Sequence, residues 1–192
     1  MSKLIYGIGY NSVGDYQNRR GGRYTKAYQV WLAMLNRCYD KKTQKRNPTY
    51  IGCTVDDRWH DFQDFADWFY SHPYSDTGYQ LDKDILVINN KVYSPDTCCF
   101  VPRQLNNLLT NNAAKRGDYP QGVSFYKPRS KYTANISINS KPVCLGYFDS
   151  PQEARQAYVM RKEAYVKEKA LEWRDRITDD VFQALMSWKS EC

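Results

Sequence analysis

The fold of this chain is decided by residues Gly122–Tyr158, which read GVSFYKPRSKYTANISINSKPVCLGYFDSPQEARQAY. Apolar Val123 and Phe125 alternate with Ser124 and Tyr126, and Ala134, Ile136 and Ile138 alternate with Thr133, Asn135 and Ser137. Such alternation is typical of β-strands that are buried on one face only. Asn139-Ser140 fits a tight turn into a third strand, Val143–Phe148. The stretch therefore predicts a three-stranded antiparallel sheet with one buried face.

A helix is expected directly after the third strand. Ser150 fits the N-cap, Pro151 fits the first helical position, and Glu153 completes a Ser-x-x-Glu capping box. Small alanines at 154 and 157 would let this helix approach the sheet closely. The side chains that we expect to be buried together are Phe125, Ile136, Leu145, Phe148 and Tyr158.

The other face of the predicted sheet is polar and has basic residues around it. Its strand positions are Ser124, Tyr126, Lys131, Thr133, Asn135 and Ser137, and the turns contribute Lys127, Arg129 and Lys141. Clustered cations on one face are typical of proteins that bind nucleic acids. The alternative is a small sheet that packs on another domain and binds nothing.

Four groups of residues match one known family: Gly122-Val123, Lys131-Tyr132, Leu145-Gly146-Tyr147-Phe148-Asp149, and Glu153-Ala154 with Ala157-Tyr158. On these residues the segment resembles the APETALA-type DNA-binding domain of plant ethylene-response factors, which also occurs in mobile phage endonucleases. The resemblance implies that the exposed sheet face enters the major groove of double-stranded DNA. That family reads DNA with arginines and tryptophans, and the matching positions here are less basic, so strong arginine-to-guanine recognition is not implied.

Composition indicates a folded protein without a membrane segment. The 192 residues are 42% hydrophobic and 15% aromatic, enough for one substantial core or two small ones. We expect no membrane span or signal peptide, and hence a cytoplasmic protein, located in the host cell if a phage encodes it. The six cysteines show no framework spacing, which favours free thiols over disulfides.

The net charge of +7 is unevenly distributed. Residues 1–50 hold ten Lys and Arg against two acids, residues 51–113 hold four against nine, and residues 114–149 hold six against two. Two basic segments on either side of an acidic one favour a protein that contacts a phosphate backbone at two places. Double-stranded DNA is therefore the expected partner.

The N-terminal part combines basic and aromatic segments. A Gly- and Arg-rich arm, expected to be flexible and to contact DNA, carries Arg19, Arg20 and Arg23. Apolar spacing predicts helices over 27–39 and about 59–70, the second rich in aromatic residues. Between them we expect a loop with phosphate-binding residues Lys41, Lys42, Lys45 and Arg46.

The middle of the chain contains LDKDILVINN at 81–90, YSPDTCCFVP at 93–102 and QLNN at 104–107. These segments resemble the HNH, or ββα-metal, nuclease motif. The resemblance places Asp82 at the metal-binding position, Lys83 where the general-base histidine belongs, Thr97 at a metal-ligand position, and Asn106 or Asn107 at the last position. Asp82 and Asp84, two apart on a strand, would share one face and are the candidate Mg²⁺ ligands.

Chemistry argues against hydrolysis at this centre. A lysine with an ordinary pKa near ~10.4 is protonated at neutral pH and is a poor base. His60 and His72 are the only histidines, and a lone histidine beside an aromatic helix is more often structural. Cys38, Cys53, Cys98 or Cys99, and His60 form no zinc-knuckle spacing, so zinc is not favoured.

The order of parts resembles small freestanding HNH homing endonucleases of bacteriophages. We predict an α+β protein with a basic arm at 1–26, a helical and HNH-like domain at 27–109, a linker at 110–121, an APETALA-type module at 122–173 and an amphipathic helix in 174–192. The expected function is DNA binding with weak or lost nuclease activity. The alternatives are an active endonuclease or nickase, or a scaffold that inhibits another protein through the C-terminal helix.

Overall fold

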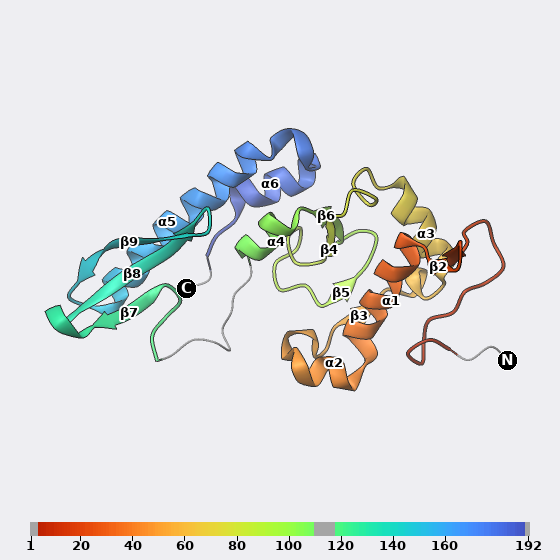
Figure 1. Cartoon of the computed structure of the whole chain (residues 1–192), viewed down its shortest axis with the longest axis horizontal. Helices are drawn as coiled ribbons and strands as arrows, with labels where there is room; N and C mark the ends of the chain where they lie inside the picture. The colour runs from red at the N-terminus through yellow and green to blue at the C-terminus, as the bar shows by residue number, and fades with distance from the viewer. Residues whose placement is uncertain (1–3, 110–117, 191–192) are drawn as a thin grey trace. The chain divides into compact units, whose positions relative to one another are not determined.

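Residues 4–109 and 118–190 are described by the computed structural model of the chain, which is a mixed α+β structure as predicted (Figure 1). Contacts divide the chain into unit 1, Met1–Asn106, and unit 2, Asn107–Cys192. The boundary falls inside helix α4 (Arg103–Leu109). Residues 110–117 of the predicted linker and residues 1–3 of the predicted arm lie outside the described part.

Unit 1 contains short strands and helices. In chain order they are β1 (Arg19–Arg20), β2 (Arg23–Tyr24), α1 (Lys26–Tyr39), α2 (Lys41–Arg46), η1 (Pro48–Tyr50), β3 (Thr54–Val55), η2 (Asp57–Trp59), α3 (Phe62–Ser71), β4 (Gln80–Asp82), β5 (Val92–Tyr93), β6 (Cys99–Val101) and α4. The strands form three separate pairs: β1 with β2 and β4 with β6 are antiparallel, whereas β3 with β5 is parallel.

An aromatic core holds unit 1 together. Helix α1 begins where the Thr25 hydroxyl accepts a hydrogen bond from Tyr28 N, and its apolar stripe, which includes Trp31, is buried against α3. The Trp31 indole N–H donates to the carbonyl of Trp59 at 2.8 Å, which satisfies its polar edge inside the core. The predicted aromatic centre is confirmed.

Two predicted boundaries in unit 1 are wrong, and caps explain both. Asp40 ends α1, where its backbone N–H donates to the Asn36 carbonyl, and its carboxylate accepts a hydrogen bond from Thr43 N at 2.7 Å. This side-chain bond caps a new helix, so residues 41–46 form α2 instead of the predicted loop. Asp61 caps α3 through Gln63 N at 3.0 Å, so this helix begins at Phe62. Trp59 belongs to η2 instead.

The arm before α1 contains a hairpin and lies against α3. Gly21 and Gly22 have φ of +57° and +78° and connect β1 to β2, a conformation that glycine adopts without steric cost. Further upstream, Tyr16 N donates to the side chain of Gln63 at 3.0 Å, and the Gln63 amide donates back to the Tyr16 carbonyl at 3.0 Å. These bonds tie the arm to α3.

Unit 2 is a three-stranded antiparallel sheet with the order β7–β8–β9, followed by helices (Figure 1). Its elements are β7 (Val123–Tyr126), η4 (Lys127–Arg129), β8 (Lys131–Ile138), β9 (Lys141–Phe148), α5 (Pro151–Glu172), η5 (Arg174–Arg176) and α6 (Asp179–Ser187). The β8–β9 register shifts between Ala134 and Asn135, beside Gly146 with its φ of +143°.

Helix α5 covers one face of the sheet, and Ala134, Ile136, Ala154 and Tyr158 are buried between them. Gly122, with φ +81°, lies against the Tyr158 ring so closely that a Cβ there would come within 2.0 Å of Tyr158 Cδ2. The predicted core is correct for Ile136 and Tyr158 but wrong for Phe125, which is 40% exposed. Leu145 and Phe148 are half-buried, because α5 covers the middle of the sheet more than its margins.

Helix α5 begins at a side-chain cap, whereas Thr178 at the start of α6 makes no side-chain cap hydrogen bond. Ser150 Oγ accepts from Glu153 N at 3.2 Å as predicted, whereas the Glu153 carboxylate accepts from Asp149 N instead of Ser150 N. Helix α6 packs on α5, and Val181 and Leu185 of its apolar stripe are fully buried. Within 4–109 and 118–190, no helix combines the length and apolar character needed to cross a bilayer.

Candidate nucleic-acid interface

The face of the unit 2 sheet turned away from α5 is called here the outer sheet face. Strand pairing places Ser124 opposite Thr133, Thr133 opposite Tyr147, Asn135 opposite Cys144, and Tyr126 opposite Lys131. Since paired residues share a face, the members of the outer sheet face are Ser124, Tyr126, Lys131, Thr133, Asn135, Ser137, Pro142, Cys144 and Tyr147. All the strand positions that the sequence predicted for DNA contact are among them.

A hydrogen-bonded network joins three of these residues. Ser124 Oγ and Thr133 Oγ1 lie 2.9 Å apart, and Asn135 Nδ2 donates to Thr133 Oγ1 at 3.0 Å. Thr133 is only 5% exposed because its neighbours cover it, so it positions Asn135 instead of offering its own hydroxyl to a ligand. Asn135 and Ser137 are exposed and present polar groups to solvent.

Aromatic rings and cations lie at the end of the outer sheet face next to η4. The rings of Tyr126 and Tyr147 are 5.3 Å apart, and the Arg129 guanidinium lies 4.5 Å from the centre of the Tyr147 ring. Lys131 forms an ion pair with Asp149. Stacking on Tyr147 thus keeps the Arg129 guanidinium beside the sheet, and Arg129 remains exposed to solvent.

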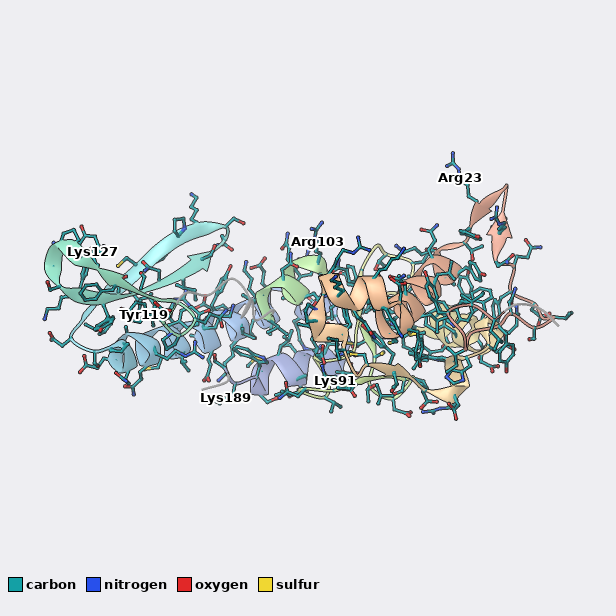
Figure 2. All side chains as sticks on the ribbon, turned by 90° about the horizontal axis from the view of Figure 1, so that it is seen from below. Arg23, Lys91, Arg103, Tyr119, Lys127 and Lys189 are labelled. Atoms are coloured by element: carbon teal, nitrogen blue, oxygen red, sulfur yellow. The ribbon has the colours of Figure 1, made fainter. Side chains whose placement is uncertain are left out.

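Two more lysines extend the positive charge at the turns. Lys127 follows β7 (Figure 2) and Lys141 begins β9, and both are exposed. Within the described ranges, no carboxylate lies within ion-pair distance of either ammonium group. Such charges are available to phosphate oxygens.

Unit 1 presents the other predicted DNA contacts on two short elements. Lys41, Lys42, Lys45 and Arg46 are all exposed on α2, a helix with no buried residue. Arg19, Arg20 and Arg23 are exposed on the β1–β2 hairpin, where Arg19 stacks on Tyr24 with 4.2 Å between its guanidinium carbon and the ring centre. Each element concentrates positive charge in a few residues.

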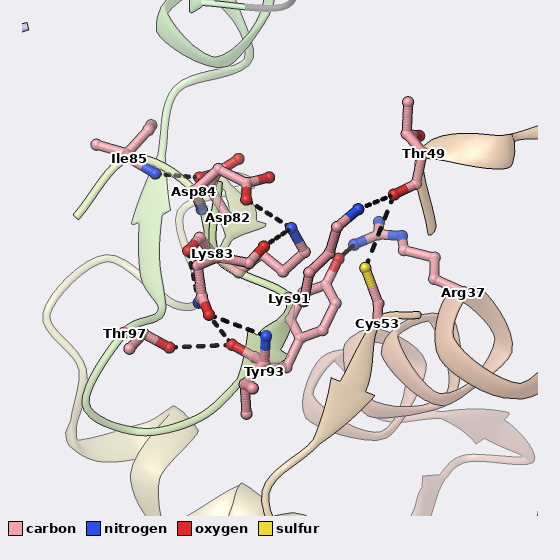
Figure 3. A network of polar contacts seen from close by, with 12 residues as sticks. Arg37, Thr49, Cys53, Asp82, Lys83, Asp84, Ile85, Lys91, Tyr93 and Thr97 are labelled. Carbon is pink, nitrogen blue, oxygen red and sulfur yellow. Dashed lines mark hydrogen bonds and ion pairs between the residues drawn. The ribbon is translucent and has the colours of Figure 1, made fainter. Parts of the chain in front are cut away.

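The segment predicted to resemble a nuclease motif is organised around a buried lysine (Figure 3). Lys83 is 5% exposed, and its ammonium donates to Asp84 Oδ1 at 2.6 Å and to the Asn90 carbonyl at 2.6 Å. Strand β4 ends at Asp82, whose carboxylate accepts from Asp84 N and Ile85 N at 2.8 and 2.9 Å. The prediction that Asp82 and Asp84 share a strand face is therefore wrong, because the chain turns between them.

The remaining predicted catalytic positions lie around the same loop. Asn90 donates to the carbonyls of Lys83 and Val92, and Thr97 Oγ1 donates to the Val92 carbonyl at 3.1 Å (Figure 3). Asn106 lies on α4 and donates to the Gln80 side chain on β4 at 3.0 Å. Asp82, Lys83, Asp84 and Thr97 are thus joined through hydrogen bonds that close a loop, and Asn106 supports its first strand.

One oxygen of each candidate metal-binding carboxylate is already engaged by the protein itself. Asp82 Oδ1 is engaged by two backbone N–H groups, and the Asp84 carboxylate is paired with an ammonium group. Burial raises the pKa of the Asp82 carboxyl above its ordinary value, although these two N–H donors lower it in part. In the portion of the chain that the structure describes, no three His, Cys, Asp or Glu side chains are arranged to hold a metal ion.

The histidines and cysteines have structural surroundings. His60 Nε2 lies 3.1 Å from the Val55 carbonyl, and the His72 ring packs on Phe100 with centres 5.1 Å apart. Burial raises the pKa of the Cys38 and Cys98 thiols to about 12, so neither is a ready metal ligand or nucleophile at neutral pH.

Comparisons with protein-family models, with curated proteins and with solved structures found no match to this chain. The assignment of function therefore depends on the geometry described above.

Sequence reasoning missed three features of these surfaces. The first feature is the contact between Tyr147 and Arg129. Strand pairing after the register shift at Gly146 places the Tyr147 ring beside Arg129. The β1–β2 hairpin carried a readable signal, because Gly-Gly between two short segments is typical of a two-residue turn. The stacked pair Tyr16 and Tyr70 joins residues far apart in the sequence, and no local pattern indicates it.

Proposed function

We propose that this chain binds double-stranded DNA through the outer sheet face of unit 2. The observation that carries the proposal is the Ser124–Thr133–Asn135 network on the outer sheet face, with exposed Arg129 stacked on Tyr147 beside it and exposed Lys127 in the adjoining turn. The network offers hydrogen-bonding groups suited to base edges, and the cations at its margins suit phosphates on either side of a groove.

The charge on unit 1 supports the same function. The cations of α2 and of the β1–β2 hairpin are exposed and lie on elements that bury little or nothing themselves. Surface cations of this kind are more useful for contacts with a polyanion than for stability. We expect them to add salt-dependent affinity without base specificity.

We further propose that the segment β4–β6–α4 derives from an HNH-type nuclease centre whose activity is weak or lost. Support comes from Lys83, which the sequence resemblance puts in place of the base and whose side-chain nitrogen donates to Asp84 and to the Asn90 carbonyl. An ammonium group in two short hydrogen bonds cannot accept a proton from water. The carboxylates beside it are used to build the loop.

Duplex binding is tested by measuring affinity across a salt series with the full chain. Each lost phosphate contact lowers the slope of log affinity against log salt by about 0.9, so changing Lys127, Arg129 and Lys131 together to Ala should lower it by roughly 2 to 3. The charge-matched control changes three exposed or half-exposed cations of the unit 2 helical region to Ala, namely Lys167, Arg174 and Lys189. Equal losses from both triple variants would refute the sheet as the binding surface.

Loss of nuclease activity is tested with supercoiled plasmid. The purified chain with Mg²⁺ or Mn²⁺ should leave the plasmid intact, and Lys83→His alone should not create nicking, because Asp82 remains tied to the backbone. Cleavage by the unmodified chain that Asp82→Ala abolishes would replace this proposal with that of an active HNH-like endonuclease.

A further inference from the structure

The β1–β2 hairpin places two like charges opposite one another. Arg20 and Arg23 are cross-strand partners on either side of the Gly21-Gly22 turn, so both side chains are on the same face. Directly opposed like charges destabilise a strand pair unless an anion lies between them. Neither arginine is within ion-pair distance of a carboxylate among the residues that the structure describes, and Arg23 projects away from the rest of unit 1 (Figure 2).

An open cleft adjoins the hairpin at Arg20. Its volume is about 470 Å³, and its lining residues are Asp15, Tyr16, Gln17, Arg20, Thr25 and Tyr70. The rings of Tyr16 and Tyr70 stack with centres 5.3 Å apart, and Tyr70 remains 49% exposed. The cleft thus has an aromatic wall, a cation at the hairpin and a carboxylate at Asp15.

We propose that this cleft binds one unpaired nucleotide of a nucleic-acid strand. The phosphate lies between Arg20 and Arg23, which removes their repulsion, and the base stacks on the exposed ring of Tyr70. The Asp15 carboxylate accepts a hydrogen bond from an N–H group on the Watson–Crick edge of the base. This inference goes beyond duplex binding by the outer sheet face, because it assigns Arg20 and Arg23 a specific ligand in addition to the general salt-dependent contacts proposed above.

The chemistry of the cleft explains why the nucleotide must be unpaired. Every base carries at least one N–H on its Watson–Crick edge, and in a duplex that N–H is already bonded to the opposite base. A stacked base inside a duplex also has no face to offer to Tyr70. The carboxylate of Asp15 excludes a phosphate from its own end of the cleft, so the ligand is oriented with its phosphate towards the hairpin.

The experiment uses the full chain and a short single-stranded oligonucleotide that contains one 5-iodouracil, a base that crosslinks to a stacked aromatic ring on irradiation. The expected adduct, located by mass spectrometry, is on Tyr70. Tyr70→Phe should retain it because the ring remains, and Tyr70→Leu should abolish it and weaken binding roughly tenfold or more. Tyr10→Leu, at an exposed ring outside the cleft, is the matched control.

A second pair of variants guards against misfolding of Tyr70→Leu. Arg20→Gln with Arg23→Gln should weaken oligonucleotide binding more than Lys26→Gln with Arg103→Gln, which removes the same charge from exposed sites of unit 1. Adducts confined to Tyr126 or Tyr147, or equal effects of the two double variants, would overturn the inference. Duplex binding without a Tyr70 adduct contradicts this inference alone, whereas a Tyr70 adduct without duplex binding contradicts only the proposed function.

Discussion

Replacing Gly122 by Ala should destabilise unit 2 more than the change of conformational preference alone explains. Gly122 has φ +81°, a left-handed conformation that costs a residue with a Cβ about 1–2 kcal/mol. The new Cβ would also lie 2.0 Å from Tyr158 Cδ2, where ordinary contact begins at 3.4 Å. Tyr158 is buried under the sheet and cannot swing into solvent, so overpacking adds about 1–3 kcal/mol. We expect a total loss of roughly 2–5 kcal/mol.

Gly78 provides a matched control for the backbone contribution. Its φ is +82°, nearly the same as that of Gly122, and a Cβ there would meet nothing within 4 Å. Gly78→Ala should therefore cost only the conformational part. Hydrogen exchange is the appropriate assay, because the β8 amides report opening of unit 2 and the α1 amides report opening of unit 1.

A double-mutant cycle isolates the clash between the two residues. In the background of Tyr158→Leu, which removes the ring, Gly122→Ala should cost only about as much as Gly78→Ala. The reasoning fails if Gly122→Ala costs no more than Gly78→Ala in the natural background. It also fails if removal of the Tyr158 ring leaves the cost of Gly122→Ala unchanged.

Three further predictions concern burial. Ile136→Asp should unfold unit 2, because Ile136 is 5% exposed under α5, whereas Ser137→Asp on the outer sheet face should leave the melting temperature of unit 2 nearly unchanged. Equal effects of the two variants, or a larger effect of Ser137→Asp, would contradict this assignment of faces. Exposed Cys144 should react with iodoacetamide at pH 8 in the native chain, whereas Cys38 and Cys98 should react only on unfolding, as mass spectrometry would show. Burial raises the pKa of the Cys38 and Cys98 thiols from 9.0 to about 12, so the folded state favours their protonated forms. The stability that this preference contributes is fully present below pH 9 and should be lost as the pH rises from about 9 to 12. Urea unfolding at a series of pH values would measure the loss.

The sequence predicted those features whose cause is local. Period-two alternation located β7 and β8, and the Ser150 and Pro151 signals located the start of α5 correctly. Alternation assigns a face but does not show how far a helix extends over it, which is why Phe125 was wrongly expected to be buried. Helix α2 was missed because KKTQKR has no apolar period, and only the Asp40 cap indicated it.

The candidate sites were predicted less completely than the fold. Positions on the outer sheet face followed from alternation, but the burial of Thr133 under its own neighbours depends on pairing across the sheet. The function of Lys83 as the centre of a hydrogen-bonded loop depends on Asn90, seven residues away, which sequence spacing does not specify. The cleft beside the hairpin brings together Tyr16 and Tyr70, which only tertiary structure can do.

The register shift beside Gly146 also affects the solubility of unit 2. In the order β7–β8–β9, the outer strands each leave one edge without a partner strand among residues 4–109 and 118–190. An open edge can pair with a strand of another molecule and so begin aggregation. In β9, Pro142 has no N–H to donate and the strand is irregular at Gly146. Strand β7 is only four residues long. Neither edge therefore offers a long regular template on which a strand of another molecule could pair.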